Sequence, residues 1–159
     1  MDFGLSQDQQ MLRDAISRTL ADTCPLDHVR ECTEGTASFS DKVSSALGEL
    51  GIWGMMVPEQ YGGLGMTMLD AAVVAEQLGY AVAPVPFIGS HVLAPLALAQ
   101  GGSEELKAHW LPRIAKGEAQ VAVAIAQTVE IRDQASVDFD GEKLDGTALF
   151  ALDFLGADA

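Results

Sequence analysis

The stretch Val57-Pro58-Glu59-Gln60-Tyr61-Gly62-Gly63-Leu64-Gly65 places one proline and three glycines within nine residues. Pro58 fixes its own φ and pushes Val57 towards an extended conformation, whereas glycine tolerates the positive φ values that cost other residues about 1 kcal/mol or more. The stretch therefore predicts a tight turn between two helical segments. A phosphate-binding loop is not expected, because the preceding residues 46–53 have a helical pattern and the chain contains no GxGxxG motif.

Helical patterns lie on both sides of this turn and extend from Ser6 to about Lys116. Ser6 and Gln9 have the spacing of a capping box at the start of the first helix, which we expect to end at Pro25. The polar residues that follow, up to Ser38, are predicted to be irregular. A short second helix with an apolar stripe comes next, formed by Val43, Leu47 and Leu50 and closed by Gly51.

Three further helices are predicted after the turn. Thr67 and Asp70 have the spacing of an N-cap and its N3 residue, and the helix body at 69–78 is apolar nearly all round, so we expect it to be buried. Gly79 should end this helix. The next helix covers 87–99 with a bend at Pro95, and Ser103 caps a last one whose first turn is acidic, which favours the helix dipole.

The periodicity changes after Gly117. Val121, Val123 and Ile125 alternate with alanines, and this two-residue period on β-branched positions predicts a strand. Further short strands are predicted at 135–139, 143–144 and 147–152, with Asp-Gly turns at 140–141 and 145–146. The sequence therefore predicts an α+β fold, with an all-α helical domain at 1–117 and a partial β domain at 118–159.

Four motifs resemble, in order, the N-terminal part of the acyl-CoA dehydrogenase family. They are Phe3-Gly4-Leu5-Ser6, the pair formed by 47–54 and 58–65, Glu76-Gln77-Leu78-Gly79, and the segment 102–118. The resemblance implies a helical N-terminal domain followed by the start of a β-barrel domain. It also implies a flavoprotein oxidoreductase of fatty acid metabolism, in which FAD-dependent α,β-desaturation of an acyl-CoA thioester combines proton abstraction with hydride transfer to the flavin.

The family's catalytic carboxylate belongs to a C-terminal helical bundle, and no carboxylate of these 159 residues matches it. We therefore expect no catalytic residue here and no activity from this chain alone. The alternative is a non-catalytic, dehydrogenase-like partner subunit or remnant that assembles with a complete acyl-CoA dehydrogenase. Either hypothesis implies a homo- or hetero-oligomer.

The resemblance also indicates which residues should face the cofactor. Ile125, Ala126, Gln127 and Thr128 occupy the place of the family's Thr-Glu-Pro motif, and the Gly-Ser-Asp loop that follows it in the family is missing. Phe150 and Leu152 stand where a tryptophan and a hydroxyl residue normally meet the flavin. Phe150 can still stack on an isoalloxazine ring, but Leu152 donates no hydrogen bond.

The substrate should meet residues 84–90, where family members line the acyl tunnel. Phe87 and Ser90 are the candidates for substrate binding, although an aromatic residue at a helix start is also common in a protein core. No metal site is expected, because His91 and His109 have no histidine or cysteine at the neighbouring helical positions.

Composition limits the partners and the location. A net charge of −14 argues against nucleic acid or an anionic membrane as the partner. The start of the chain has no basic, apolar leader, and prolines interrupt the longest apolar tract at 82–99, so neither a signal peptide nor a membrane span is predicted. Cys24 and Cys32 are expected to be reduced, and the expected location is the cytoplasm.

Overall fold

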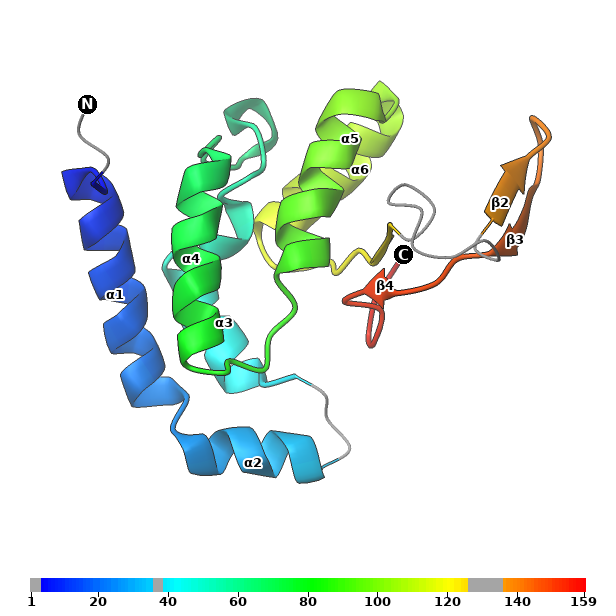
Figure 1. Cartoon of the computed structure of the whole chain (residues 1–159). Coiled ribbons are helices and arrows are strands. Elements are labelled where there is room, and N and C mark those ends of the chain that lie inside the picture. The colour runs from blue at the N-terminus through cyan, green and yellow to red at the C-terminus, as the bar shows by residue number, and fades with distance from the viewer. Residues whose placement is uncertain (1–3, 36–38, 126–135) are drawn as a thin grey trace.

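The structure is a computed structural model that describes residues 4–35, 39–125 and 136–159. Its helices form one body, and the short strands follow at the C-terminal end (Figure 1). The α-helices are α1 (Gln7–Thr23), α2 (Leu26–Glu34), α3 (Asp41–Glu49), α4 (Met68–Tyr80), α5 (Ala94–Gly101) and α6 (Glu104–Ala115). Short helical turns are η1 (Ile52–Gly54), η2 (Glu59–Tyr61) and the π-helix η3 (Ile88–Leu93), and the strands are β1 (Val123–Ala124), β2 (Ser136–Phe139), β3 (Leu144–Thr147) and β4 (Ala151–Leu152). The predicted α+β class is confirmed.

The turn at 57–65 forms as predicted. Gly62 and Gly65 adopt φ values of 84° and 57°, and a Cβ on Gly63 would lie 2.0 Å from the carbonyl oxygen of Val57. The amide of Leu64 donates to the carbonyl of Gly54 at 2.9 Å. Glycine is therefore required here for two reasons: it adopts positive φ at two positions, and it allows close backbone approach at a third.

Two capping boxes fix the starts of the two central helices. Ser6 with Gln9 begins α1, and Thr67 with Asp70 begins α4, as the spacing predicted. The Gln9 amide also donates to the Asp70 carboxylate at 2.9 Å, which joins the first turns of α1 and α4. Ser103 caps α6 by accepting from the amide of Leu106.

The core lies mainly between α1, α3, α4 and η1. Its most buried side chains are apolar residues at helical spacing, namely Ile16 and Leu20 of α1, Val43 and Leu47 of α3, and Val74 and Leu78 of α4. A smaller cluster under α6 joins Leu111 and Ile114 to Val57 of the turn. The turn is thereby anchored to α6, a helix that lies far from it in the sequence.

Two helix predictions were wrong. The supposedly irregular stretch after Pro25 forms α2, because a proline that ends one helix is also well suited to begin the next. The apolar body of α4 is not buried all round, since Met68 and Leu69 are exposed. The helix also ends at Tyr80, one residue beyond Gly79.

The helix predicted at 87–99 is in fact two elements. The π-helix η3 precedes α5, and Pro95 lies in the first turn of α5, where its missing amide breaks no helical hydrogen bond. The predicted bend at Pro95 is therefore better described as a change of helix type at Ala94.

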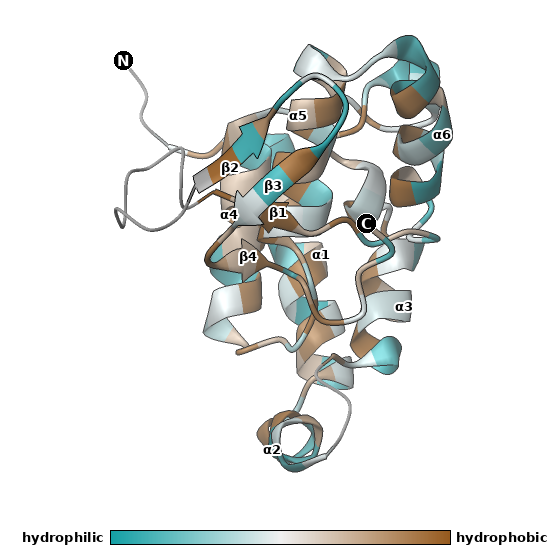
Figure 2. Ribbon diagram, turned by 90° about the vertical axis from the view of Figure 1, so that its right-hand side faces the viewer, coloured by the Kyte–Doolittle hydropathy of each residue, from teal (hydrophilic) through white to brown (hydrophobic). Residues whose placement is uncertain are grey.

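The strands form two small antiparallel pairs. β1 pairs with β4, with Val123 opposite Leu152, and β2 pairs with β3 around the predicted turn at Asp140-Gly141. The predicted turn at Asp145-Gly146 was wrong, because both residues lie within β3. Figure 1 shows the β2–β3 hairpin standing away from the helices, and Figure 2 shows hydrophobic and hydrophilic residues along it.

Candidate functional site

A groove of about 570 Å³ lies where α2, the C-terminal end of α4, the segment 82–88 and β4 meet. Its wall is mainly apolar. The lining residues are Val29, Thr33, Ala75, Leu78, Gly79, Val82, Ala83, Pro84, Val85, Phe87, Ile88, Leu152 and Asp153. The hydroxyl of Thr33 donates to the carbonyl of Val29, so this polar group is already satisfied within α2.

Local sequence explains why a hollow forms at this place. Small residues leave room on the α4 side, and a Cβ built on Gly79 would meet nothing within 4 Å. The chain leaves α4 through Val82, which takes φ 50°, a strained value for a β-branched residue. The amide of Ala83 then donates back to the carbonyl of Leu78 at 2.9 Å, which holds the wall of the groove against the helix end.

Two predicted site residues meet in this groove. Phe87, a candidate for substrate binding, is 4% exposed and packs into the core behind the groove wall. Leu152, a candidate for flavin contact, reaches the same groove from β4. The sequence predicted that Phe87 contacts the substrate and Leu152 the flavin, whereas both residues lie beside one cavity.

Ser90, the other substrate candidate, is fully buried next to the groove. Its hydroxyl donates to the carbonyl of Val121 at 3.1 Å, and its amide donates to the carboxylate of Asp153 at 2.9 Å. Ser90 therefore connects η3 to the residues that precede β1 and follow β4. Its hydroxyl is used within the protein rather than facing the groove.

Asp153 is a site residue that sequence reasoning missed. It follows β4 directly, adopts φ 56°, and is the one charged residue among those that line the groove. Gly89 permits its approach, because a Cβ there would lie 2.9 Å from the Asp153 carboxylate. The side-chain amide of Gln120 donates to the Asp153 carbonyl at 2.6 Å. An aspartate after a short strand is typical of a turn, so the sequence offered no specific signal.

The remaining flavin candidates are only partly described. Residues 126–128, which hold Ala126, Gln127 and Thr128, lie outside the described ranges. Ile125 is half-buried after β1, and Phe150 is 56% exposed with φ 55°. With Leu152, they offer one aromatic ring and two aliphatic groups but no side-chain donor, so their side chains do not fit the polar edge of a flavin.

His91 is a buried titratable residue outside the groove. It is 4% exposed, stacks on Trp53 with ring centroids 4.3 Å apart, and its Nδ1 has no hydrogen-bond partner in the described structure. Burial lowers the pKa of His91 to about 4, against the opposing effect of a hydrogen bond with the Trp53 backbone. A polar cavity of about 140 Å³ lies beside it, lined also by Glu118 and Asp158.

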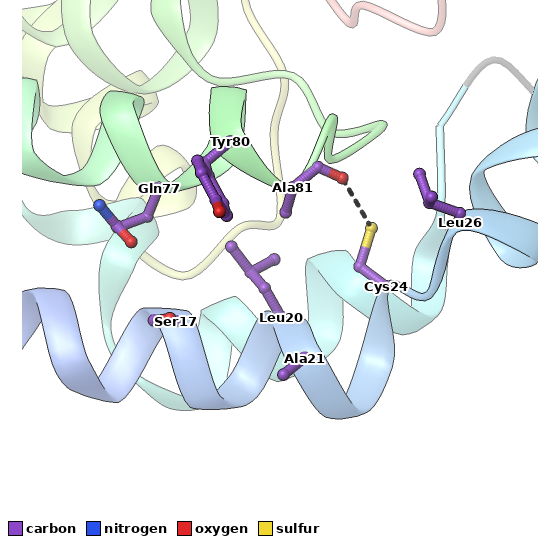
Figure 3. A pocket seen from close by; sticks show the side chains of 8 residues that line it. All are labelled: Ser17, Leu20, Ala21, Cys24, Leu26, Gln77, Tyr80 and Ala81. Carbon is purple, nitrogen blue, oxygen red and sulfur yellow. Dashed lines mark hydrogen bonds between the residues drawn. The ribbon is translucent and has the colours of Figure 1, made fainter.

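A second cavity, of about 400 Å³, opens between α1 and α4 near the start of α2 (Figure 3). Cys24 lies at its edge, with the thiol 3.9 Å from the carbonyl of Ala81. Desolvation by burial, the largest cause, raises the pKa of this thiol, which disfavours the reactive thiolate. This cavity therefore carries no evident chemistry.

Neither a metal site nor a membrane-spanning helix is found within the described ranges. There, no group of three or more histidine, cysteine, aspartate or glutamate side chains is arranged to hold a metal ion. His28 approaches Ser40 and Cys32, at 2.7 Å and 3.8 Å from its Nε2, but Ser40 Oγ also accepts from the Val43 amide as a helix cap. Among the same residues, every helix is too short or too polar to cross a bilayer.

Comparison with known proteins gives a consistent result. The family model for the acyl-CoA dehydrogenase N-terminal domain matches residues 6–118. The acyl-CoA dehydrogenase FadE27 of Mycobacterium tuberculosis is 32% identical over 148 residues, which cover 92% of this chain and 40% of FadE27.

Solved structures agree with the sequence match. The ChsE4–ChsE5 complex from Mycobacterium tuberculosis matches 93% of this chain and 40% of its own chain, with a TM-score of 0.80 at 28% identity. An acyl-CoA dehydrogenase from Bacillus anthracis complexed with FAD matches 76% of this chain and 21% of its own, with a TM-score of 0.60 at 28% identity. The chain thus spans less than half the length of the relatives it matches.

Proposed function

The chain belongs to the acyl-CoA dehydrogenase family, and from this we propose that it forms the N-terminal part of an assembly that binds acyl-CoA thioesters. The observation that carries the proposal is the apolar groove, in which Phe87 from the start of η3 and Leu152 from β4 lie beside the same cavity. The helices and the segment around β4 together form the wall of the groove.

The groove suits the acyl group better than the coenzyme. Its volume of about 570 Å³ lies in the range of small-molecule pockets, and its lining is apolar apart from Thr33 and Asp153. Burying a methylene group in such a groove is worth about 0.8 kcal/mol. The phosphates of a coenzyme would gain nothing here, because no lysine or arginine is among the lining residues.

The parent activity that we propose is FAD-dependent α,β-desaturation of the acyl-CoA, as an oxidoreductase of fatty acid metabolism. The relative from Bacillus anthracis, which is described as complexed with FAD, supports the cofactor. When bound, FAD supplies the hydride acceptor of this reaction. In this chain the groove residues would hold and orient the acyl group. The carboxylate base would come from a part of the assembly outside these 159 residues.

A partner-subunit role is the second candidate function. It is favoured by the described flavin-facing positions, because Ile125, Phe150 and Leu152 have no side-chain donor for the flavin. The ChsE4–ChsE5 structure is a complex by its name, which supports assembly with a second dehydrogenase-type subunit. In this role the chain would shape the acyl groove while another subunit carries the flavin.

We also propose a domain boundary after Gly117, dividing the chain into 1–117 and 118–159. It is supported by the end of α6 at Ala115 and by the change to short strands from Val123 onward. A cytoplasmic location is proposed as well, and the unpaired thiols of Cys24 and Cys32 support it.

A flavin titration separates the two candidate functions. FAD binding by the purified chain would be followed by flavin absorbance and fluorescence, with and without a medium-chain acyl-CoA, and acyl-CoA binding would be measured by calorimetric titration. Micromolar FAD binding with substrate-dependent bleaching would support the enzyme. Acyl-CoA binding without FAD binding would support the partner subunit. Absence of acyl-CoA binding would contradict the assignment of the groove.

A further inference from the structure

We propose that Asp153 determines the specificity of the groove, by selecting acyl groups that carry a hydrogen-bond donor such as a hydroxyl. This inference rests on the proposed function, because it takes the groove to be the acyl site. It names a substrate class within that function: hydroxylated acyl groups rather than plain or carboxylate-bearing ones.

The composition of the groove wall favours this role for Asp153. Asp153 is the one charged residue among the thirteen that line the groove, and the hydroxyl of Thr33 is already bonded to the carbonyl of Val29. A carboxylate beside an apolar cavity loses part of its hydration when a ligand fills that cavity. A ligand with a hydrogen-bond donor at this point replaces the lost hydration of the carboxylate, and a ligand without a donor does not.

The carboxylate of Asp153 is also held in a fixed place. Oδ2 accepts from the amide of Ser90 at 2.9 Å, and the Asp153 carbonyl accepts from the side chain of Gln120 at 2.6 Å. The left-handed backbone at Asp153, with φ 56°, is uncommon for a residue other than glycine and is fixed by these contacts. Such contacts position an acceptor at the groove without a further conformational cost on binding.

The carboxylate of Asp153 can also accept more hydrogen bonds than it receives from the described residues. An ionised carboxylate accepts through two oxygens, and the described structure gives this one a single hydrogen bond, to Ser90 on Oδ2. Oδ1 has no hydrogen bond among the described residues, and in this proposal it is the atom that accepts from the ligand. A ligand carboxylate at the same point would meet like charge, so the groove should discriminate against acyl groups with a second acid function.

Matched ligands test the proposal. A medium-chain acyl-CoA would be compared, by calorimetric titration of the full chain, with its monohydroxylated isomers in which the hydroxyl moves along the chain. For the isomer that binds best, the corresponding methyl ether and carboxylate would be titrated too. We expect one hydroxylated isomer to bind about tenfold more tightly than the parent, as one hydrogen bond to a charged group provides, and the ether and carboxylate to lose this gain.

The Asp153→Asn variant gives the sharper readout. Its side-chain oxygen can still accept from the Ser90 amide, and asparagine tolerates a left-handed backbone, so the fold should be retained. Its NH₂ group would now offer a donor to the groove. We therefore expect the hydroxylated ligand to lose its advantage over the methyl ether, because a hydroxyl oxygen and an ether oxygen can both accept from this NH₂ group. The matched control is Asp145→Asn on the exposed strand β3, which should bind like wild type.

The outcomes separate this inference from the function on which it rests. If the parent acyl-CoA binds and no hydroxylated isomer binds better, or if Asp153→Asn keeps the full wild-type advantage of the hydroxylated isomer over its methyl ether, the specificity role is wrong while the acyl groove stands. If no acyl-CoA binds, the groove assignment fails and the specificity role fails with it.

Discussion

At the scale of single residues, His91 has the most unusual environment. It is buried against Trp53 beside a small cavity that also contains Glu118 and Asp158, and its Nδ1 has no partner in the described structure. A buried neutral imidazole resists protonation, which agrees with its lowered pKa of about 4. Unfolding returns the side chain to water, where its pKa is ordinary.

This difference predicts a loss of stability in mild acid. As the pH falls below 6.5, His91 becomes protonated in the unfolded state, whereas in the folded state it stays neutral until about pH 4. The free energy of unfolding should therefore decrease across this window by about 3 kcal/mol. Above pH 7.5 the contribution is fully present. Urea unfolding of wild type and His91→Phe at pH 7.5 and 4.5 would measure it. If the free energy of unfolding decreased equally in both proteins between pH 7.5 and 4.5, the prediction would be contradicted.

Gly63 allows a second prediction at the same scale. A Cβ there would lie 2.0 Å from the Val57 carbonyl oxygen, whereas a Cβ on Gly62 meets nothing within 4 Å. Gly63→Ala must displace backbone and should cost about 3 kcal/mol, but Gly62→Ala should cost only about 1 kcal/mol for its positive φ. Chemical denaturation of the two variants compares them directly. Equal losses would show that the turn can relax at Gly63.

At the scale of elements, one carboxylate joins the first turns of α1 and α4. Asp70 accepts from the amide and hydroxyl of Thr67 and from the side chain of Gln9. Asp70→Ala should therefore lower the free energy of unfolding by about 1–2 kcal/mol, mainly through loss of the carboxylate's half of the capping box, since Thr67 still accepts from the amide of residue 70. The matched control is Glu76→Ala, an exposed carboxylate on the same helix, which should change stability by less than about 0.5 kcal/mol. Thermal unfolding of both variants would measure these changes in stability, and equal changes in the two variants would contradict the prediction.

The sequence predicts helices and turns best where local residues restrict the backbone. The turn at 57–65 and the two capping boxes were correct, because proline, glycine and the Ser/Thr caps each restrict the backbone directly. The helix α2 was missed since Pro25 was interpreted only as a stop. The π-helix η3 could not be predicted, because its hydrophobic spacing does not differ clearly from that of an α-helix over six residues.

At the scale of the whole molecule, the site could be predicted only in part. Phe87 and Leu152 were both proposed as ligand contacts, but nothing local shows that residues so far apart in sequence share one cavity. Asp153 was missed because its role depends on the amide of Ser90, which tertiary packing brings to it. The hydroxyl of Ser90 looked available in sequence and is bonded to Val121 in the structure.

The hairpin carries a prediction about association. Phe139 and Leu144 are paired across β2 and β3 and are 66% and 67% exposed. An exposed apolar pair on a short sheet favours pairing with a second chain, so we expect concentration-dependent self-association. Replacing both residues with threonine should reduce it, whereas Leu106→Gln on α6 should not. Sedimentation velocity would measure this, and a monomer at high concentration would contradict it.

The central claim is that the groove between α2, α4 and β4 holds the acyl group. Gly79 lines this groove and Gly101 ends α5 away from it, and a Cβ on either would meet nothing within 4 Å. The most direct measurement is calorimetric titration of a medium-chain acyl-CoA into wild type, Gly79→Phe and Gly101→Phe. The account predicts at least a tenfold loss of affinity for Gly79→Phe alone. Wild-type affinity in Gly79→Phe would contradict it.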